Sequence, residues 1–240
     1  MLHVSIAPDI LFYFLSFPIS NTLLTSLIFL VLSIVVGILF LVKQNNSKST
    51  FVFFVRYCLN QLYNLFQPIL QNKIDIFFPF LSALFLFILF SNWLGLLPGV
   101  GSIVVNVEER TVPLLKAATA DLNTTISLAL IVFIVIQVSG IKYLGLRGYL
   151  SKFISFSGII AFFTGILETI SEFSKIISFA FRLFGNIFAG EVLLAVIVFL
   201  VPILAPFPFL LLEVFVGFIQ ALVFAMLAAV FINLATTAHH

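Results

Sequence analysis

The sequence predicts an all-α protein that crosses a membrane several times. Of its 240 residues, 62% are hydrophobic and 8% are charged, and the mean hydropathy is +1.29, far outside the range of soluble proteins. Several apolar runs approach or exceed the roughly 20 residues that a helix needs to cross a bilayer. No polar block is long enough to fold by itself, so we expect one membrane domain over residues 1–240. It would contain five membrane-inserted helices and one amphipathic helix at the membrane surface.

The amino-terminal half predicts two spans separated by the amphipathic helix. Residues 1–18 are mixed in character and predict an ordered or interfacial tail, and residues 19–42 complete an N-terminal span within segment 1–42. Because the first 42 residues contain no Lys or Arg, we do not expect a cleaved signal peptide. Residues 50–76 mix polar with aromatic and aliphatic side chains, which indicates a helix lying on the surface. The second span follows Pro79 and ends near Trp93, an expected interfacial anchor.

The carboxy-terminal half predicts a third span and a long hairpin. A polar loop over residues 99–120 precedes Asp121 and Asn123, either of which can cap a span that ends near residue 141. Two spans thus occupy residues 77–141, and a basic loop follows over residues 142–152. The next proline after residue 151 is Pro202. A continuous helix of that length would be about 75 Å long, more than twice the roughly 30 Å of hydrocarbon.

Such a helix cannot stand upright in a bilayer. It must break near Gly158 or Gly165 or lie strongly tilted, and we favour the tilt. With a last helix over residues 209–235, segment 151–238 would form a long, strongly tilted antiparallel hairpin.

Basic residues predict the orientation. Segments 43–75 and 142–152 carry an excess of Lys and Arg, whereas segment 99–120 balances its basic residues with acids. Cytoplasmic loops are enriched in Lys and Arg. We therefore expect the amino terminus outside and the carboxyl terminus in the cytoplasm.

An arginine inside apolar sequence is the sharpest single feature. Placing an arginine at the centre of a membrane helix costs about 2.5–3.5 kcal/mol on insertion scales, so Arg182 needs a functional reason. Because successive residues of a helix are rotated by about 100°, six polar residues around Arg182 fall on one face of its helix, and we call them the polar stripe. The stripe consists of Glu168, Ser171, Ser174, Ser178, Arg182 and Asn186. We expect it to face protein or a water-filled crevice and not lipid.

The other polar residues of the last two helices leave alternatives open. Arg182 could pair with Glu191 or Glu213 of its own chain, although Glu191 lies on the opposite side of the helix from Arg182. Glu213 and Gln220 share one face, where intramembrane carboxylates could pass protons or hold water.

Three smaller features of the sequence have simpler alternatives. Glu172 and Lys175 could form a solvated pair. The three serines could bond to their own backbone, yet their register with Arg182 favours a wetted groove. Asp121 and Asn123 could be caps or polar groups at the mouth of an aqueous path.

Several function classes find no support in the sequence. There is no glycine-rich phosphate loop, no His or Cys pair at ligand spacing, and no Ser, His and acid trio. We therefore expect no enzyme, no nucleotide site, no metal and no cofactor. The net charge of +2 comes from short loops and not from a basic patch, so we expect no nucleic-acid partner.

Four blocks of sequence resemble one known family, the F-type ATP synthase subunit a, also called ATPase subunit 6. The blocks are residues 178–191 (SFAFRLFGNIFAGE), 92–98 (NWLGLLP), 120–125 (ADLNTT) and 217–224 (GFIQALVF). Their order and spacing cover residues 90–235, whereas the first 75 residues match only in layout. Some members have histidine where Glu213 stands.

The resemblance implies a stationary, non-catalytic proton-channel subunit. Arg182 would face the carboxylate of a rotating c-ring. The outer half-channel would be lined by Glu191, Glu213, Gln220 and Asn186, with Asp121 and Asn123 at its mouth. The cytoplasmic half-channel would be lined by Glu168, Ser171, Ser174 and Ser178. The implied partners are the c-ring subunits, the peripheral-stalk b subunits and membrane lipid. The lack of a targeting segment and the overall layout lead us to expect a bacterial inner membrane. The alternative is a secondary transporter that uses the same polar crevice for a small solute.

Overall fold

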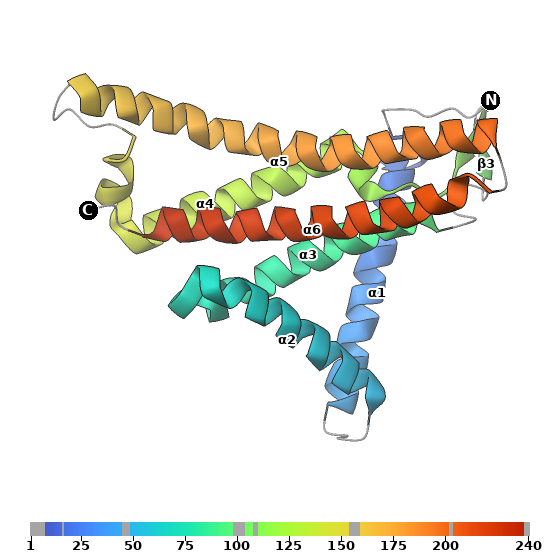
Figure 1. Cartoon of the computed structure of the whole chain (residues 1–240), viewed down its shortest axis with the longest axis horizontal. Helices are drawn as coiled ribbons and strands as arrows, with labels where there is room; N and C mark the ends of the chain where they lie inside the picture. The colour runs from blue at the N-terminus through green and yellow to red at the C-terminus, as the bar shows by residue number, and fades with distance from the viewer. Residues whose placement is uncertain are drawn as a thin grey trace.

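In the part of the chain that the structure describes, the fold consists of six α-helices, two short β-hairpins and two single-turn helices (Figure 1). The structure is a computed structural model and describes residues 8–15, 17–44, 49–97, 104–107, 110–153, 159–201 and 204–237. In chain order the elements are β1 (Ile10–Phe14), β2 (Phe17–Ser20), α1 (Asn21–Lys43), α2 (Thr50–Leu70), η1 (Gln71–Lys73), α3 (Ile74–Leu96), β3 (Val104–Val107), β4 (Arg110–Pro113), η3 (Ala118–Ala120), α4 (Leu122–Leu150), α5 (Ile159–Leu200) and α6 (Pro206–Thr236).

Five helical segments in the described part of the chain are long and apolar enough to cross a membrane, which confirms the predicted class. One of them, Thr50–Leu96, combines α2, η1 and α3. The chain changes direction between α2 and α3 at Gln71, whose φ of 49° is not helical. The position of α2 on the membrane surface stays a prediction.

The long helices α5 and α6 lie side by side and run in opposite directions (Figure 1). Helices α3 and α4 pack against them, and α1 runs across the direction of this layer (Figure 1). The buried core lies among α2, α3, α4, α5 and α6. The buried face of α6 is rich in alanine, with Ala221, Ala225 and Ala228 inaccessible to solvent. Small residues at such a face let neighbouring helices approach closely.

Local sequence explains where several helices begin. The Ser20 side chain accepts a hydrogen bond from the backbone N–H of Leu23 and caps α1. Asp121 caps α4 in the same way by accepting from the N–H of Asn123 at 2.9 Å, as predicted. Pro206 stands in the first turn of α6, where its fixed φ favours a helix and its missing N–H costs nothing.

One prediction about a connecting segment is wrong. Residues 142–150, predicted as a loop, are helical on both sides of a kink at Gly145, whose φ of 72° and ψ of 159° are not helical. The predicted tail contains the antiparallel hairpin β1–β2, and the polar loop over residues 99–120 contains the hairpin β3–β4 and η3. Short strands paired through backbone hydrogen bonds leave little trace in hydropathy.

The first helix of the predicted hairpin begins later than residue 151, the predicted start. Helix α5 comprises 42 residues and passes through Gly165 without a break, and α6 begins a few residues before the predicted start. Gly158, Pro202 and the loop acids Glu108 and Glu109 lie outside the described residues.

Candidate functional site

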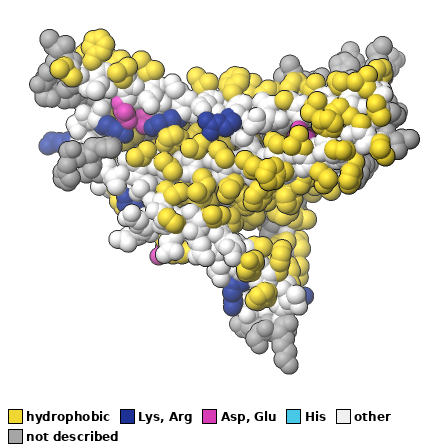
Figure 2. Space-filling view, viewed as in Figure 1, with side chains coloured by type: hydrophobic (Ala, Val, Ile, Leu, Met, Phe, Trp, Pro, Cys, Tyr) yellow, Lys and Arg dark blue, Asp and Glu magenta, His cyan; other side chains and the backbone are white. Residues whose placement is uncertain are grey.

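Helix α5 presents the predicted polar stripe on an exposed face. Ser171, Ser174, Ser178, Arg182 and Asn186 are exposed, as are the apolar neighbours Ile170, Phe173, Ile177 and Phe181. Figure 2 shows basic side chains between α5 and α6 with hydrophobic surface around them. An open face of this composition can be covered only by something that tolerates both apolar contact and charge.

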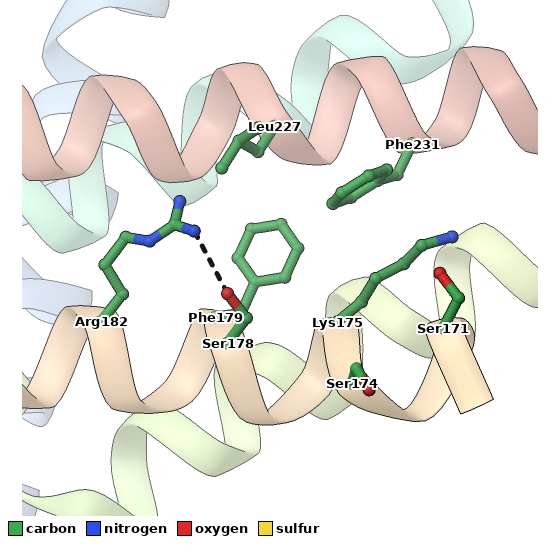
Figure 3. Close-up of a pocket in the computed structure, with 8 residues that line it drawn as sticks. All are labelled: Ser171, Ser174, Lys175, Ser178, Phe179, Arg182, Leu227 and Phe231. Atoms are coloured by element: carbon green, nitrogen blue, oxygen red, sulfur yellow. Dashed lines mark hydrogen bonds between the residues drawn. The ribbon is translucent and has the colours of Figure 1, made fainter.

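Arg182 makes a single hydrogen bond to a side chain and no ion pair among the described residues. Its Nη2 donates to Ser178 Oγ at 3.1 Å (Figure 3), one turn earlier on α5. The salt bridges in the described part of the chain are Lys152–Glu168 and Lys175–Glu172, so the alternative of a pair with Glu191 or Glu213 is not realised. A guanidinium keeps its charge at any accessible pH. In a membrane such a charge faces a protein partner or a water-filled cavity.

A cavity of about 280 Å³ opens beside Arg182 between α5 and α6 (Figure 3). Its lining residues are Ser171, Ser174, Lys175, Ser178, Phe179, Arg182, Leu227 and Phe231. The structure thus brings together the three serines and the arginine of the stripe. Ser174 Oγ donates to the backbone carbonyl of Ile170, whereas Ser178 accepts from Arg182. Glu168 is not among the lining residues and instead pairs with Lys152 at 2.7 Å.

The polar residues beyond Arg182 on α5 meet those of α6. Asn186 Nδ2 donates to Gln220 Oε1 at 2.7 Å, and Gln220 Nε2 is buried without a protein partner in the described structure. Glu191 and Glu213 line a second, smaller cavity of about 10 Å³. A cavity of that size is about the minimum that can hold one water molecule.

A glycine makes room for the Glu213 side chain. Glu213 is buried, and its carboxylate lies against Gly190 of α5 so closely that a Cβ at this position would collide with both oxygens. A side chain at residue 190 would therefore have to displace the Glu213 carboxylate from this position.

Asn92 is a functional candidate that sequence reasoning did not identify. It lies in the same small cavity, and its Nδ2 donates to the carbonyl of Gly217 on α6 at 3.0 Å. Its Oδ1 accepts from Thr119 Oγ1 at 2.6 Å, which links α3 to η3. The sequence feature that could have identified Asn92 is a polar amide side chain within an otherwise apolar span.

Asp121 and Asn123 have structural partners. Besides capping α4, the Asp121 carboxylate accepts a hydrogen bond from Thr22 Oγ1 of α1 at 3.1 Å and is buried. Asn123 is exposed, and its backbone carbonyl accepts from Ser127 Oγ. Their role at the mouth of an aqueous path stays a prediction.

Glu172 and Lys175 pair as the spacing predicts, at 2.6 Å, but the pair is not solvated. Only 4% of the Glu172 side chain is exposed, because α4 covers it. Gln137 Nε2 donates to Glu172 Oε2 at 3.1 Å, and Tyr149 Oη donates to Gln137 Oε1 at 2.5 Å. Gln137 and Tyr149 were missed because their link to α5 depends on tertiary packing. Among the described residues, no three His, Cys, Asp or Glu side chains group as a metal site would require.

Comparison with known proteins gives one consistent result. Residues 23–233 match the family described as ATP synthase A chain. Over 163 residues the chain is 42% identical to the chloroplastic ATP synthase subunit a of Stigeoclonium helveticum. This match covers 68% of the chain and 62% of the relative, so the chain spans less than two thirds of the relative's length.

Proposed function

Since this chain belongs to the ATP synthase A chain family, we propose that it is the stationary proton-channel subunit of a rotary F-type ATP synthase. In this proposal it forms two offset half-channels against a c-ring and couples proton flow to rotation of the ring. It carries no catalytic nucleotide site of its own. The observation that carries the proposal is Arg182, an exposed guanidinium without an acidic partner among the described residues, on the face of a helix long enough to span a membrane.

The permanent charge of Arg182 accounts for the coupling. A proton arriving from outside neutralises a ring carboxylate, which can then rotate into lipid. A returning carboxylate meets Arg182, ionises and releases its proton to the other side. Because a guanidinium does not give up its proton, it can attract the carboxylate without passing protons itself. Each charge that crosses 100 mV delivers about 2.3 kcal/mol, so a direct leak between the half-channels would waste that work.

Two groups of residues supply the half-channels in this proposal. The outer half-channel contains Glu191, Glu213, Asn186 and Gln220, supported by the small cavity at the two acids and by the unpartnered Nε2 of Gln220. Asp121 and Asn123 would stand near its mouth. The cytoplasmic half-channel is the larger of these two cavities, lined by Ser171, Ser174 and Ser178. Glu168, which does not line the cavity, would stand toward its cytoplasmic end.

The arrangement of the helices supports an oblique course for α5 and α6. They run across the direction of α1 (Figure 1), so if α1 crosses the bilayer upright, the two long helices cross it strongly tilted. Helix α2 would lie on the cytoplasmic surface, because its exposed residues include both Phe53 and Phe54 and the polar Asn60 and Gln61.

The proposed surroundings follow from the same assignment. The chain would contact c-ring subunits, peripheral-stalk b subunits and lipid, with its amino terminus outside and its carboxyl terminus in the cytoplasm. A bacterial inner membrane stays a prediction, since the relative named above is chloroplastic.

Cross-linking tests the partner most sharply. With Cys58, the only cysteine, replaced by serine, Ser178→Cys and Asn186→Cys should each form a disulfide with a cysteine introduced on the outer helix of the ring hairpin. Val35→Cys, exposed on α1, is the matched control and should not cross-link.

The result also separates the two function classes. A stationary proton-channel subunit purifies together with a ring of small hairpin subunits. A secondary transporter purifies without the ring, and absence of both the ring and the cross-links would reject the proposal.

A further inference from the structure

A buried polar cluster joins α4 to the wall of the larger cavity. Glu172 Oε1 accepts from Lys175 Nζ at 2.6 Å, and Glu172 Oε2 accepts from Gln137 Nε2 at 3.1 Å. Both carboxylate oxygens are thus occupied, and the residue is only 3% exposed. Lys175 Nζ also lies over the ring of Phe231 on α6, 4.8 Å from its centroid. Three helices therefore fix the position of one ammonium group.

The backbone of α4 is shaped to complete this cluster. Tyr149 donates to Gln137, and its ring lies against Gly140 so closely that a Cβ there would collide with it. The left-handed conformation of Gly145 redirects the chain between these two residues. Nothing in the proton path described above requires such an arrangement.

The charges on the cavity wall explain what the cluster can do. Lys175 and Arg182 are the two charged residues among those that line the cavity. They are seven residues apart, which places them about 10 Å apart along the helix axis. Arg182 has no acidic partner in the described structure, whereas Lys175 is paired with Glu172.

We propose that Glu172 is a positioning residue of the cytoplasmic half-channel. It neutralises and immobilises the Lys175 ammonium, so that Arg182 remains the only uncompensated cation among the residues lining the cavity. Gln137 and Tyr149 hold the Glu172 carboxylate in place for this purpose. The inference rests on the proposed proton-channel function and adds a residue that acts through another.

A second uncompensated cation would hinder protons that enter the cavity. At an effective dielectric constant near 20, a unit charge about 10 Å away lowers the proton occupancy of a site roughly tenfold. ATP-driven pumping draws its protons through this cavity, so its rate should fall by a similar factor when the compensating carboxylate is lost.

The test compares single and double variants in the assembled, reconstituted ATP synthase. ATP-driven acidification of liposomes is measured per assembled complex for Glu172→Gln, Lys175→Gln and the double variant. Glu172→Gln should pump roughly tenfold more slowly than the wild type, as estimated from the charge it leaves behind. Lys175→Gln and the double variant should both pump several-fold faster than Glu172→Gln, since neither leaves an unpaired cation.

A purely structural salt bridge gives a different pattern. Removing either partner of a buried pair leaves an uncompensated charge, so both single variants would then suffer alike. Equal losses in Glu172→Gln and Lys175→Gln, or wild-type pumping by Glu172→Gln, would overturn the proposal.

A further variant keeps the proposal testable if Glu172→Gln does not assemble. Ser174 is exposed on the same cavity and has no acidic residue three or four positions away, so Ser174→Lys adds an unpaired cation without disturbing the buried cluster. It should pump several-fold more slowly than the neutral variant Ser174→Gln, and equal rates in these two would overturn the proposal.

Failure of this inference can be told apart from failure of the proposed function. If the stripe cysteines cross-link to the ring but Glu172→Gln pumps normally, only the role of Glu172 is lost. If no ring accompanies the chain, the function itself is lost.

Discussion

At the scale of single residues, charge and size determine what the site can do. Arg182 lacks an acidic partner in the described structure, and the two acids at the small cavity lie where α5 and α6 approach through Gly190. The stripe could be predicted because residues on one helix face recur at a fixed angle. The contacts of Gln137 with Glu172 and of Asn186 with Gln220 could not, because they join residues 35 and 34 positions apart.

Gly190→Ala should impair proton transport while Gly37→Ala should not. The added methyl group collides with the Glu213 carboxylate, the end of a flexible side chain, and must displace it from its position beside residue 190. A Cβ at Gly37 meets nothing within 4 Å, which makes it the control. Pumping per assembled complex is the measurement. Equal rates for the two variants would mean that the position of Glu213 does not matter.

At the scale of elements, the long helices were predictable and their connections were not. Apolar length fixed five helical segments, and Asp121 marked the start of α4. The hairpins β1–β2 and β3–β4 are held by hydrogen bonds between backbone groups, which the pattern of side chains in the sequence does not indicate. The helical structure on both sides of the kink at Gly145 could not be predicted, because basic residues at a membrane surface predict a loop as readily as a helix end.

Gly145→Ala should destabilise the chain and Gly148→Ala should not. Gly145 has a φ of 72°, a region that costs a residue with a Cβ roughly 1–2 kcal/mol. At Gly148 a Cβ would lie 3.8 Å from the Leu144 side chain, an ordinary contact, and alanine is the better helix former. The temperature at which the purified complex dissociates should be lower for Gly145→Ala and unchanged for Gly148→Ala. A lower dissociation temperature for both variants would indicate that any added side chain on this segment is destabilising, whatever the backbone conformation of the glycine.

At the scale of the whole molecule, one lysine joins distant parts of the chain. Lys73, between α2 and α3, donates to the carbonyl oxygen and the Oγ1 of Thr236 at the end of α6, at 3.1 and 2.7 Å. It also lies over the ring of Tyr143 on α4, 5.1 Å from its centroid. A cation at the carboxyl end of a helix is favourable, because the last carbonyls carry partial negative charge. This link could not be read from the sequence, since it joins residues 163 positions apart.

Lys73→Met should lower the free energy of unfolding by about 1.5–3 kcal/mol, the range for hydrogen bonds made by a charged group. Lys43→Met at the exposed end of α1 is the control and should have little effect. Thermal unfolding followed by limited chymotrypsin digestion reports the change, because chymotrypsin cleaves after aromatic residues such as Tyr63 and Phe77 and its sites do not depend on Lys73. Cleavage near the α2–α3 junction at a lower temperature is expected for Lys73→Met. Identical unfolding and digestion profiles for Lys73→Met and Lys43→Met would show that Lys73 does not stabilise the position of α6.

The proposed role of the whole molecule depends on a cation that cannot release its proton. The most direct measurement is ATP-driven proton pumping by reconstituted complexes that carry Arg182→Lys. Lysine keeps the charge but can lose its proton when it is buried, so the proposal predicts that pumping is abolished although the complex assembles. Pumping at the wild-type rate with lysine in place would contradict it.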